Sequence, residues 1–307
     1  MCSIRTKTPP LNAIRCRMRF FLSLLIIQIS LNLQAEVNYS YHIDDSKNLD
    51  IESILKDDNI KLKRGSNSFH YGYIENPVWI KISIKNSADI GKIVLNNTTI
   101  EEIDFFVIRD AQIKKKFNTG IVFRKESRDI PSPRFAFNLP SNPEECDIWI
   151  RLNSNESIFG SFTLFNDKEF LEYSFLNTLF SILPFGICIS LVLFYGIIFL
   201  RLKERVYFFY IFYAFTVILL MLRINGIGPY YVWFFIPALN KFPAFFETFP
   251  LLLATLFSIE FLRLKTYLPK VRQILIYLIY ATCFVMILAL LGLSRLSLIS
   301  SQFLGIL

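Results

Sequence analysis

The stretch that decides the fold is residues 175–200, FLNTLFSILPFGICISLVLFYGIIFL, which contains no charged residue. It exceeds the roughly 20 apolar residues that a helix needs to cross a bilayer core about 30 Å thick. Three further apolar segments follow, at about 206–224, 242–262 and 274–293. The sequence therefore predicts a transmembrane helical domain over residues 173–307, with the start of a fifth segment near Phe303.

The charges between these segments predict the side of the membrane on which each loop lies. Basic residues fill the first and third connections: Arg201, Lys203, Arg205, Arg263, Lys265, Lys270 and Arg272. The second connection, 225–241, is rich in aromatic residues and has one basic residue, Lys241. Because short basic loops stay in the cytoplasm, we expect the aromatic loop and everything before residue 173 to lie outside.

Residues 1–35 have the three parts of a secretory signal peptide. A basic region ends at Arg19, an apolar stretch runs to about Leu31, and Ala35 is the small residue before the expected cut. The apolar stretch is shorter than a spanning helix requires. We expect a cleaved signal peptide, with an uncleaved signal anchor as the alternative, and either one exports the next segment.

Residues 36–172 have the polar composition of a soluble domain and predict a strand-rich fold. Val78–Ile84 shows the alternation of apolar and polar residues typical of a half-buried strand, and a short helix is expected near 50–56. Five further strands are expected between turn-type clusters, at Gly91–Leu95, Ile103–Arg109, Arg134–Asn138, Asp147–Leu152 and Phe159–Phe165. The predicted fold class is an all-β exported domain, jelly-roll or sandwich-like, followed by an α-helical transmembrane bundle.

Composition excludes several classes of function. Hydrophobic residues make up 53% of the chain, and the formal net charge is +8. Five cations and no acid lie in residues 1–35, so removing this segment leaves 8 − 5 = +3, too small an excess to indicate nucleic-acid binding. Cys146 stands alone in the exported domain, and His42 and His70 are the only histidines, so no disulfide, metal site or cofactor is expected there. The patterns of catalytic sites are missing, which predicts that the chain is not an enzyme.

Several short motifs rich in aromatic residues and glycine follow one another along the chain, and their order and spacing are informative. They are Tyr71-Gly72-Tyr73, Val78–Ile82, Ile103–Val107, Thr119-Gly120, Phe123-Arg124, Arg134–Phe137, Ile148–Leu152, Leu183–Ile187, Phe194–Gly196 and the loop Arg201–Arg205 that leads into Val206–Tyr210. Over residues 45–293 the sequence resembles the bacterial seven-transmembrane receptors with diverse intracellular signalling modules, with a type 2 extracellular domain.

The resemblance implies a sensor in the bacterial inner (cytoplasmic) membrane with its N-terminal domain in the periplasm. Its outer domain would bind a small, carbohydrate-like or other ligand, and its helices would pass the change inward. Full members have seven helices, often followed by a cyclase, kinase or phosphatase domain. This sequence ends after four, which leaves an adaptor that acts with a separate cytoplasmic signalling protein as the alternative.

Five residues are candidates for ligand binding in the exported domain. Trp79 and Trp149 could stack on a sugar ring, although their apolar neighbours favour a place in the core. Arg124, Arg128 and Arg134 surround a proline turn and could hold a carboxylate or phosphate. The alternative for the arginines is a solvated loop or pairing with nearby acids.

Three charged residues lie within or beside the apolar segments. Glu247 and Glu260 fall near opposite ends of the third segment, and we expect both at a membrane interface. Arg223 is expected to reach the outer interface with its long side chain.

The favoured function is a membrane sensory receptor whose outer domain binds a small ligand and whose helices relay it. The adaptor is the second class. A membrane enzyme or transporter is the third, and it is disfavoured because we find no internal repeat and few buried polar groups.

Overall fold

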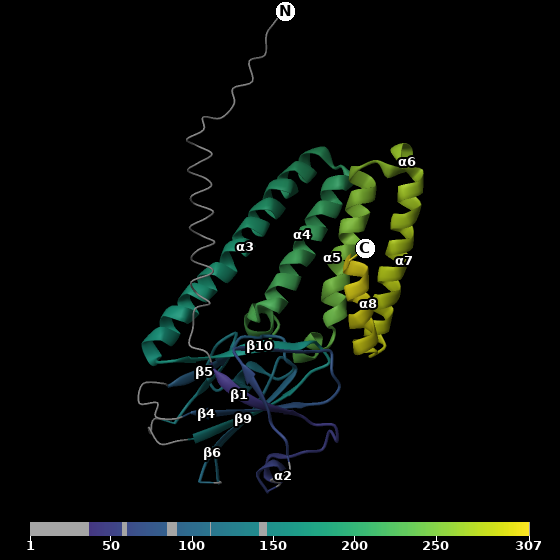
Figure 1. Cartoon of the computed structure of the whole chain (residues 1–307). Helices are drawn as coiled ribbons and strands as arrows, with labels where there is room; N and C mark the ends of the chain where they lie inside the picture. The colour runs from purple at the N-terminus through teal and green to yellow at the C-terminus, as the bar shows by residue number, and fades with distance from the viewer. Residues whose placement is uncertain (1–36, 57–59, 85–90, 111, 141–145, 307) are drawn as a thin grey trace, which may run out of the picture. The chain divides into compact units, whose positions relative to one another are not determined.

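The computed structural model describes residues 37–56, 60–84, 91–110, 112–140 and 146–306. These residues belong to one compact unit, which holds a strand-rich domain and a set of helices (Figure 1). The signal peptide expected at residues 1–35 lies outside the described residues. The strand-rich domain and the helices confirm the predicted fold class.

Two antiparallel sheets form the strand-rich domain, here called the outer domain (residues 37–165). The larger sheet has the order β2-β1-β4-β9-β6-β7, and the smaller has the order β3-β10-β5-β8. The strand bounds are β1 Asn38–Ile43, β2 Lys63–Ser66, β3 Ser68–Gly72, β4 Val78–Ile84, β5 Lys92–Leu95, β6 Glu102–Arg109, β7 Gln112–Thr119, β8 Phe135–Asn138, β9 Cys146–Asn153 and β10 Ile158–Phe165. All six strands that the sequence predicts are therefore present, within a residue or so at each end.

The main core fills the space between the two sheets. Ile80 and Ile150 from the larger sheet are paired across β4 and β9, and each is at most 1% exposed. The smaller sheet contributes residues such as Ile93 to the same cluster. Phe105 and Phe137 stack ring on ring across the gap, with centroids 4.1 Å apart. Burial of these apolar faces holds the sandwich together.

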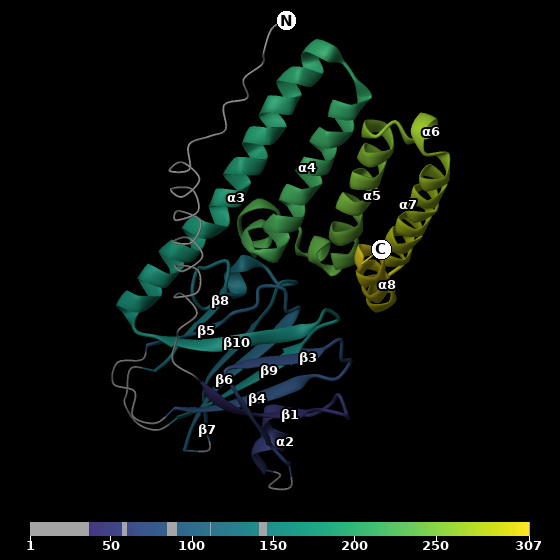
Figure 2. The same ribbon diagram turned by 45° about the horizontal axis from the view of Figure 1, so that its top comes forward.

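Each sheet also has a covered outer face. Helix α2 (Ile51–Lys56) buries Ile51 and Ile54 against the larger sheet, at the end of the outer domain far from the other helices in Figures 1 and 2. On the smaller sheet, Phe165 packs with Phe170 and Tyr173 at the start of α3. The smaller sheet is thus the one next to the first long helix.

Helix α3 (Asp167–Leu202) begins directly after β10. Asn166 and Glu169 form a reciprocal capping box, in which each side chain accepts a hydrogen bond from the backbone N–H of the other residue. At 1.5 Å per residue the helix is about 54 Å long, well beyond a bilayer core of about 30 Å. The expected domain boundary at 172/173 therefore falls inside a helix, and the outer domain ends at Phe165.

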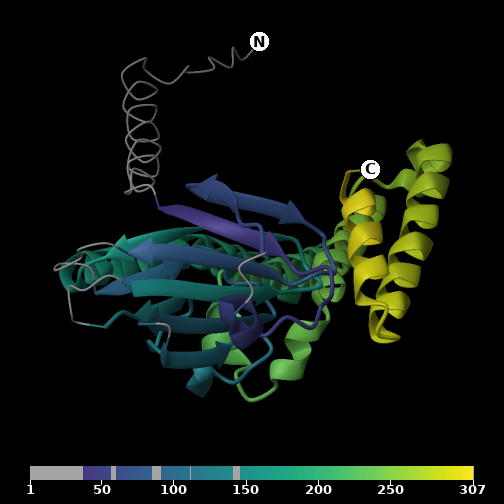
Figure 3. The same ribbon diagram turned by 60° about the horizontal axis from the view of Figure 1, so that its bottom comes forward.

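The remaining helices follow α3 in a row: α4 packs against α3, α5 against α4, and α7 against α5 (Figures 1 and 2). Their bounds are α4 Arg205–Ile224, α5 Pro243–Phe261, α6 Leu264–Tyr267, α7 Pro269–Leu290 and α8 Ser294–Ile306. Among the described residues α3, α4, α5 and α7 are long and apolar enough to cross a membrane, as the sequence predicts. Helix α8 contacts α5 and α7 (Figures 1 and 3) and begins nine residues before Phe303, the place expected for a fifth segment.

Candidate functional site

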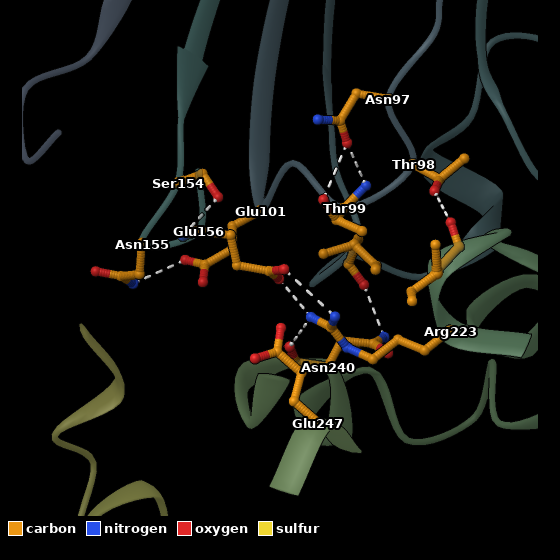
Figure 4. Close-up of polar contacts among 12 residues, drawn as sticks. Asn97, Thr98, Thr99, Glu101, Ser154, Asn155, Glu156, Arg223, Asn240 and Glu247 are labelled. Carbon is orange, nitrogen blue, oxygen red and sulfur yellow. Dashed lines mark hydrogen bonds and ion pairs between the residues drawn. The ribbon is translucent and has the colours of Figure 1, made fainter. Parts of the chain in front are cut away.

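A buried ion pair joins the outer domain to α4 (Figure 4). Arg223, in the last turn of α4, is 1% exposed, and Glu156, between β9 and β10, is 8% exposed. Nη1 of Arg223 donates to Oε2 of Glu156 over 3.3 Å, and Nη2 donates to Oε1. The fork of donors thus meets both carboxylate oxygens, the geometry in which arginine and carboxylate bind best.

Asn240 extends this contact to the loop before α5. Its carbonyl oxygen lies 3.4 Å from Nη2 of Arg223, and its side chain donates to the carbonyl of Ile121 in the outer domain over 2.8 Å. The indole N–H of Trp233 donates to Asn240 Oδ1 over 2.9 Å. One buried asparagine therefore holds the loop, α4 and the outer domain together. We call Glu156, Arg223 and Asn240 the junction cluster.

Further carboxylates surround the single guanidinium of the junction cluster. Burial raises the pKa of the Glu156 carboxyl, and Arg223 opposes that rise. Burial also raises the pKa of Glu101, which accepts a hydrogen bond from Asn155 over 2.9 Å. Glu247 of α5 acts electrostatically on Glu156 as well. Glu156 is the buried carboxylate of the three, whereas Glu101 and Glu247 are half-buried, so the buried charges at the junction are one acid and one base.

The turn after α4 touches the outer domain at a second place. The hydroxyl of Thr98 donates to the carbonyl of Ile224, the last residue of α4. Gly226 has φ +72°, and a Cβ there would lie 2.6 Å from the carbonyl oxygen of Pro133. The close approach requires glycine both for its backbone conformation and for its lack of a side chain.

Helix α8 makes the third contact. Arg295 donates through Nη2 to the carbonyl of Tyr73 over 2.5 Å and pairs through Nη1 with Glu75 at 2.5 Å. Tyr73 also packs against a small buried cluster formed by α5, α7 and α8. In addition, Glu247 accepts hydrogen bonds from the α8 side chains Ser301, over 2.6 Å, and Gln302, over 3.1 Å. The outer domain thus contacts α3 and α4 at one side and α8, the last described helix, at another.

A cavity of about 130 Å³ lies where α3 leaves the outer domain. It is lined mostly by apolar atoms and includes Arg134 from the loop before β8 and Asn177 from α3. Nη2 of Arg134 donates to Asn177 Oδ1 over 2.8 Å. We call it the junction cavity.

The structure separates the three candidate arginines. Arg124 is exposed, and Arg134 lines the junction cavity. The guanidinium of Arg128 lies 3.7 Å from the Phe135 ring centre, and burial lowers its pKa to about 9, so it stays a cation at neutral pH. Of the two nearby acids that could pair with them, Glu126 and Asp129, Asp129 binds Lys115 at 2.9 Å instead.

Both candidate tryptophans lie in the second core. Trp79 is 1% exposed and Trp149 is 5% exposed, with their rings 6.5 Å apart beneath α2. Neither ring face is open to a sugar. The geometry favours the core interpretation that the sequence left beside the ligand interpretation.

Arg223 lies at the end of α4 next to the outer domain, and its side chain is buried there instead of extending to water. Its partner Glu156 is 67 residues away in the sequence and replaces water as the source of hydrogen bonds. Sequence reasoning missed Glu156, Asn240 and Thr98 because each is an ordinary polar residue in a loop. The one available signal was Arg223 itself, since a cation at the end of an apolar helix requires a partner.

A second cavity, of about 520 Å³, lies at the opposite ends of the helices. Its lining includes five basic side chains, Lys203, Arg205, Arg263, Lys265 and Arg272, and two acidic ones, Glu204 and Glu260. No ion pair among the described residues involves any of the seven side chains. With five basic and two acidic side chains, the lining of this cavity carries a net positive charge.

Comparison with known families gives two matches that together span most of the chain. Residues 37–166 match a family described as 7TMR-DISM extracellular 2, and residues 177–307 match one described as 7TM diverse intracellular signalling. The comparison with curated proteins gives no match. The first match ends at Asn166, the cap of α3, and so covers the strands, while the second begins at residue 177 within α3 and covers the helices. The protein is a membrane protein with its N-terminal domain outside.

Proposed function

We propose that this chain, which belongs to the family of seven-transmembrane receptors with diverse intracellular signalling modules, senses a small ligand outside the membrane and relays its presence through the helices. The ligand is carbohydrate-like or anionic. The receptor acts in a bacterial cytoplasmic membrane, with the outer domain in the periplasm. It is not an enzyme, and its output passes to a cytoplasmic signalling module.

The junction cluster is the observation that supports a relay. A buried pair is tied to a single geometry, because separating its partners leaves a charge without water or a counter-ion. Movement of the turn that carries Glu156 must therefore move α4 through Arg223, or else lose the pair. A ligand that favours one position of that turn would shift the helices by its differential affinity for the two arrangements.

The cavity at the inner helix ends supports a cytoplasmic partner. Its five basic side chains favour an acidic surface on the module that receives the signal. Basic inner loops also fix the orientation of any membrane protein, so this surface serves both purposes. An adaptor that docks on a separate signalling protein would use the same surface.

The relay is tested by a change in the outer domain that is read at the inner helix ends. Spin labels at Lys203→Cys and Lys265→Cys, both exposed, report the distance between the inner ends of α3 and α6 in nanodiscs, after Cys188 and Cys283 are replaced by alanine. We expect Glu156→Gln to shift the distance distribution, because the neutral amide no longer holds Arg223 in place.

Asp104→Asn is the matched control. Asp104 is also paired with an arginine, Arg151 at 3.1 Å, but both residues lie within the larger sheet. Its substitution should leave the distribution unchanged. If Glu156→Gln gives the same distribution as the starting protein, the junction cluster does not carry a relay.

A further inference from the structure

We propose that the junction cavity is a binding site for a small organic carboxylate with an apolar body. The inference rests on the proposed function and makes it specific, since it names the site and the chemical class of the ligand. A ligand held there contacts the outer domain and α3 at once, so its binding would affect how the two pack against each other.

The cavity combines an apolar lining with one cation. Val94 of β5, Phe170 of α3 and Ile227 after α4 supply apolar walls, and Arg134 supplies the charge. Ser132, 7% exposed, and Asn177 add polar groups to the lining. Pockets with mostly apolar walls and a few placed polar groups are the usual form of small-molecule sites.

Arg134 has no anionic partner among the described residues. Its two hydrogen bonds go to neutral amides, Asn96 at 3.4 Å and Asn177 at 2.8 Å, and its guanidinium lies 5.7 Å from the Tyr173 ring centre. A guanidinium has five N–H donors, so these two bonds leave about three for a ligand. A half-buried cation with spare donors and no acid favours a carboxylate, which it can bind through two parallel bonds.

Size limits the ligand. The volume of about 130 Å³ is close to the 150 Å³ of an engineered apolar cavity that binds benzene. The body of the carboxylate is therefore about the size of one six-membered ring or a short alkyl chain.

The position of the site connects ligand to relay. Asn225, which follows α4, lines the cavity and lies two residues after Arg223 of the junction cluster. Its side-chain oxygen is 3.4 Å from the hydroxyl of Ser181 on α3. Filling the cavity would thus fix α3, the end of α4 and the Arg134 loop against one another.

Binding is measured directly on the full chain in phosphatidylcholine nanodiscs, by calorimetry with benzoate and hexanoate and with neutral benzamide as the matched probe. We expect saturable binding of at least one carboxylate, at least about tenfold tighter than benzamide, because charge-assisted hydrogen bonds are the strong ones. Arg134→Ala should weaken carboxylate binding by about tenfold or more and leave benzamide binding unchanged.

Two further variants keep the test decisive if Arg134→Ala folds poorly. Thr178→Trp places a bulky ring in the cavity from an exposed position on α3 and should abolish binding. Arg124→Ala removes an exposed arginine outside the cavity and should leave the affinity unchanged.

Three outcomes would overturn the site. They are no saturable binding of either carboxylate, wild-type affinity in Thr178→Trp, or an equal loss in Arg124→Ala. A co-purified phospholipid, found by mass spectrometry and lost in Arg134→Ala, would also overturn it in favour of a lipid headgroup. None of these results depends on the spin-label distances, so the site and the relay fail or stand separately.

Discussion

The contact between the outer domain and α4 depends on two buried charged residues, Arg223 and Glu156. Arg223 is fully buried although it ends an apolar helix, and it is stable there because Glu156 meets both of its outer nitrogens. The desolvation of such a pair costs about as much as its attraction returns, so the pair specifies geometry more than it adds stability. This supports a role in coupling.

The Glu101 carboxyl should make the stability of the protein depend on pH. Its burial raises the pKa of the carboxyl, so the folded protein binds a proton more readily than the unfolded chain. Stability therefore falls as pH rises from the ordinary glutamate pKa of about 4.3 to the raised folded value. We expect Glu101→Gln to flatten this decline in unfolding midpoints measured between pH 4 and 7.

Glu102→Gln is the control for that measurement. Glu102 lies next in the chain and accepts a hydrogen bond from Asn153 over 2.9 Å. A decline that is flattened equally in Glu102→Gln would show a general effect of net charge and would remove Glu101 from the account.

Among the elements, the turn after α4 is the most restrictive. We expect Gly226→Ala to destabilise the protein by roughly 1–3 kcal/mol, because the new Cβ meets the Pro133 carbonyl and the backbone has positive φ. Gly196→Ala in α3 is the matched control, since no atom lies within 4 Å of the added Cβ there.

The effect of each substitution is measured as the hydrogen-exchange rate of the backbone amides in the last turn of α4. Faster exchange in Gly226→Ala and unchanged exchange in Gly196→Ala is the expected pattern. Equal exchange in the two variants would mean that the turn tolerates a side chain and that the close approach is not needed.

The sequence predicted those helices and strands whose apolar residues follow a regular pattern. Strand β4 alternates and the long helices are apolar throughout, so periodicity and length identify them. Strands β1, β2, β3 and β7 were missed. The sequence of β7, QIKKKFNT, is that of a charged loop, and it is a strand because it pairs with β6 at the edge of the larger sheet.

The contacts at the junction could not be predicted from the sequence, because they join residues that are far apart in the chain. Thr98 and Ile224 are 126 residues apart, and Asn240 and Ile121 are 119 apart. Only the fold of both parts brings such pairs together. The start of α3 was also missed, although the Asn166–Glu169 capping box is visible in the sequence, because the apolar run that marks the membrane begins later.

For the whole molecule, the first test is orientation. An alkaline phosphatase reporter fused after Lys203 should be inactive, and one fused after Tyr231 should be active. The reason is that the basic loop stays inside and the aromatic loop lies outside with the outer domain. The reverse pattern would place the outer domain in the cytoplasm and end any account of an external sensor.

The most direct test of the central claim, that Glu156 and Arg223 couple the outer domain to the helices, is a double-mutant cycle. Equilibrium unfolding in mixed micelles, followed by the fluorescence of the three tryptophans, is compared for Glu156→Gln, Arg223→Met and the double variant. We predict that each single change costs about 3 kcal/mol and that the double change costs little more than one, because each single change leaves a buried partner without its counterpart. Losses that simply add would show that the two residues do not act as a pair and would contradict the account.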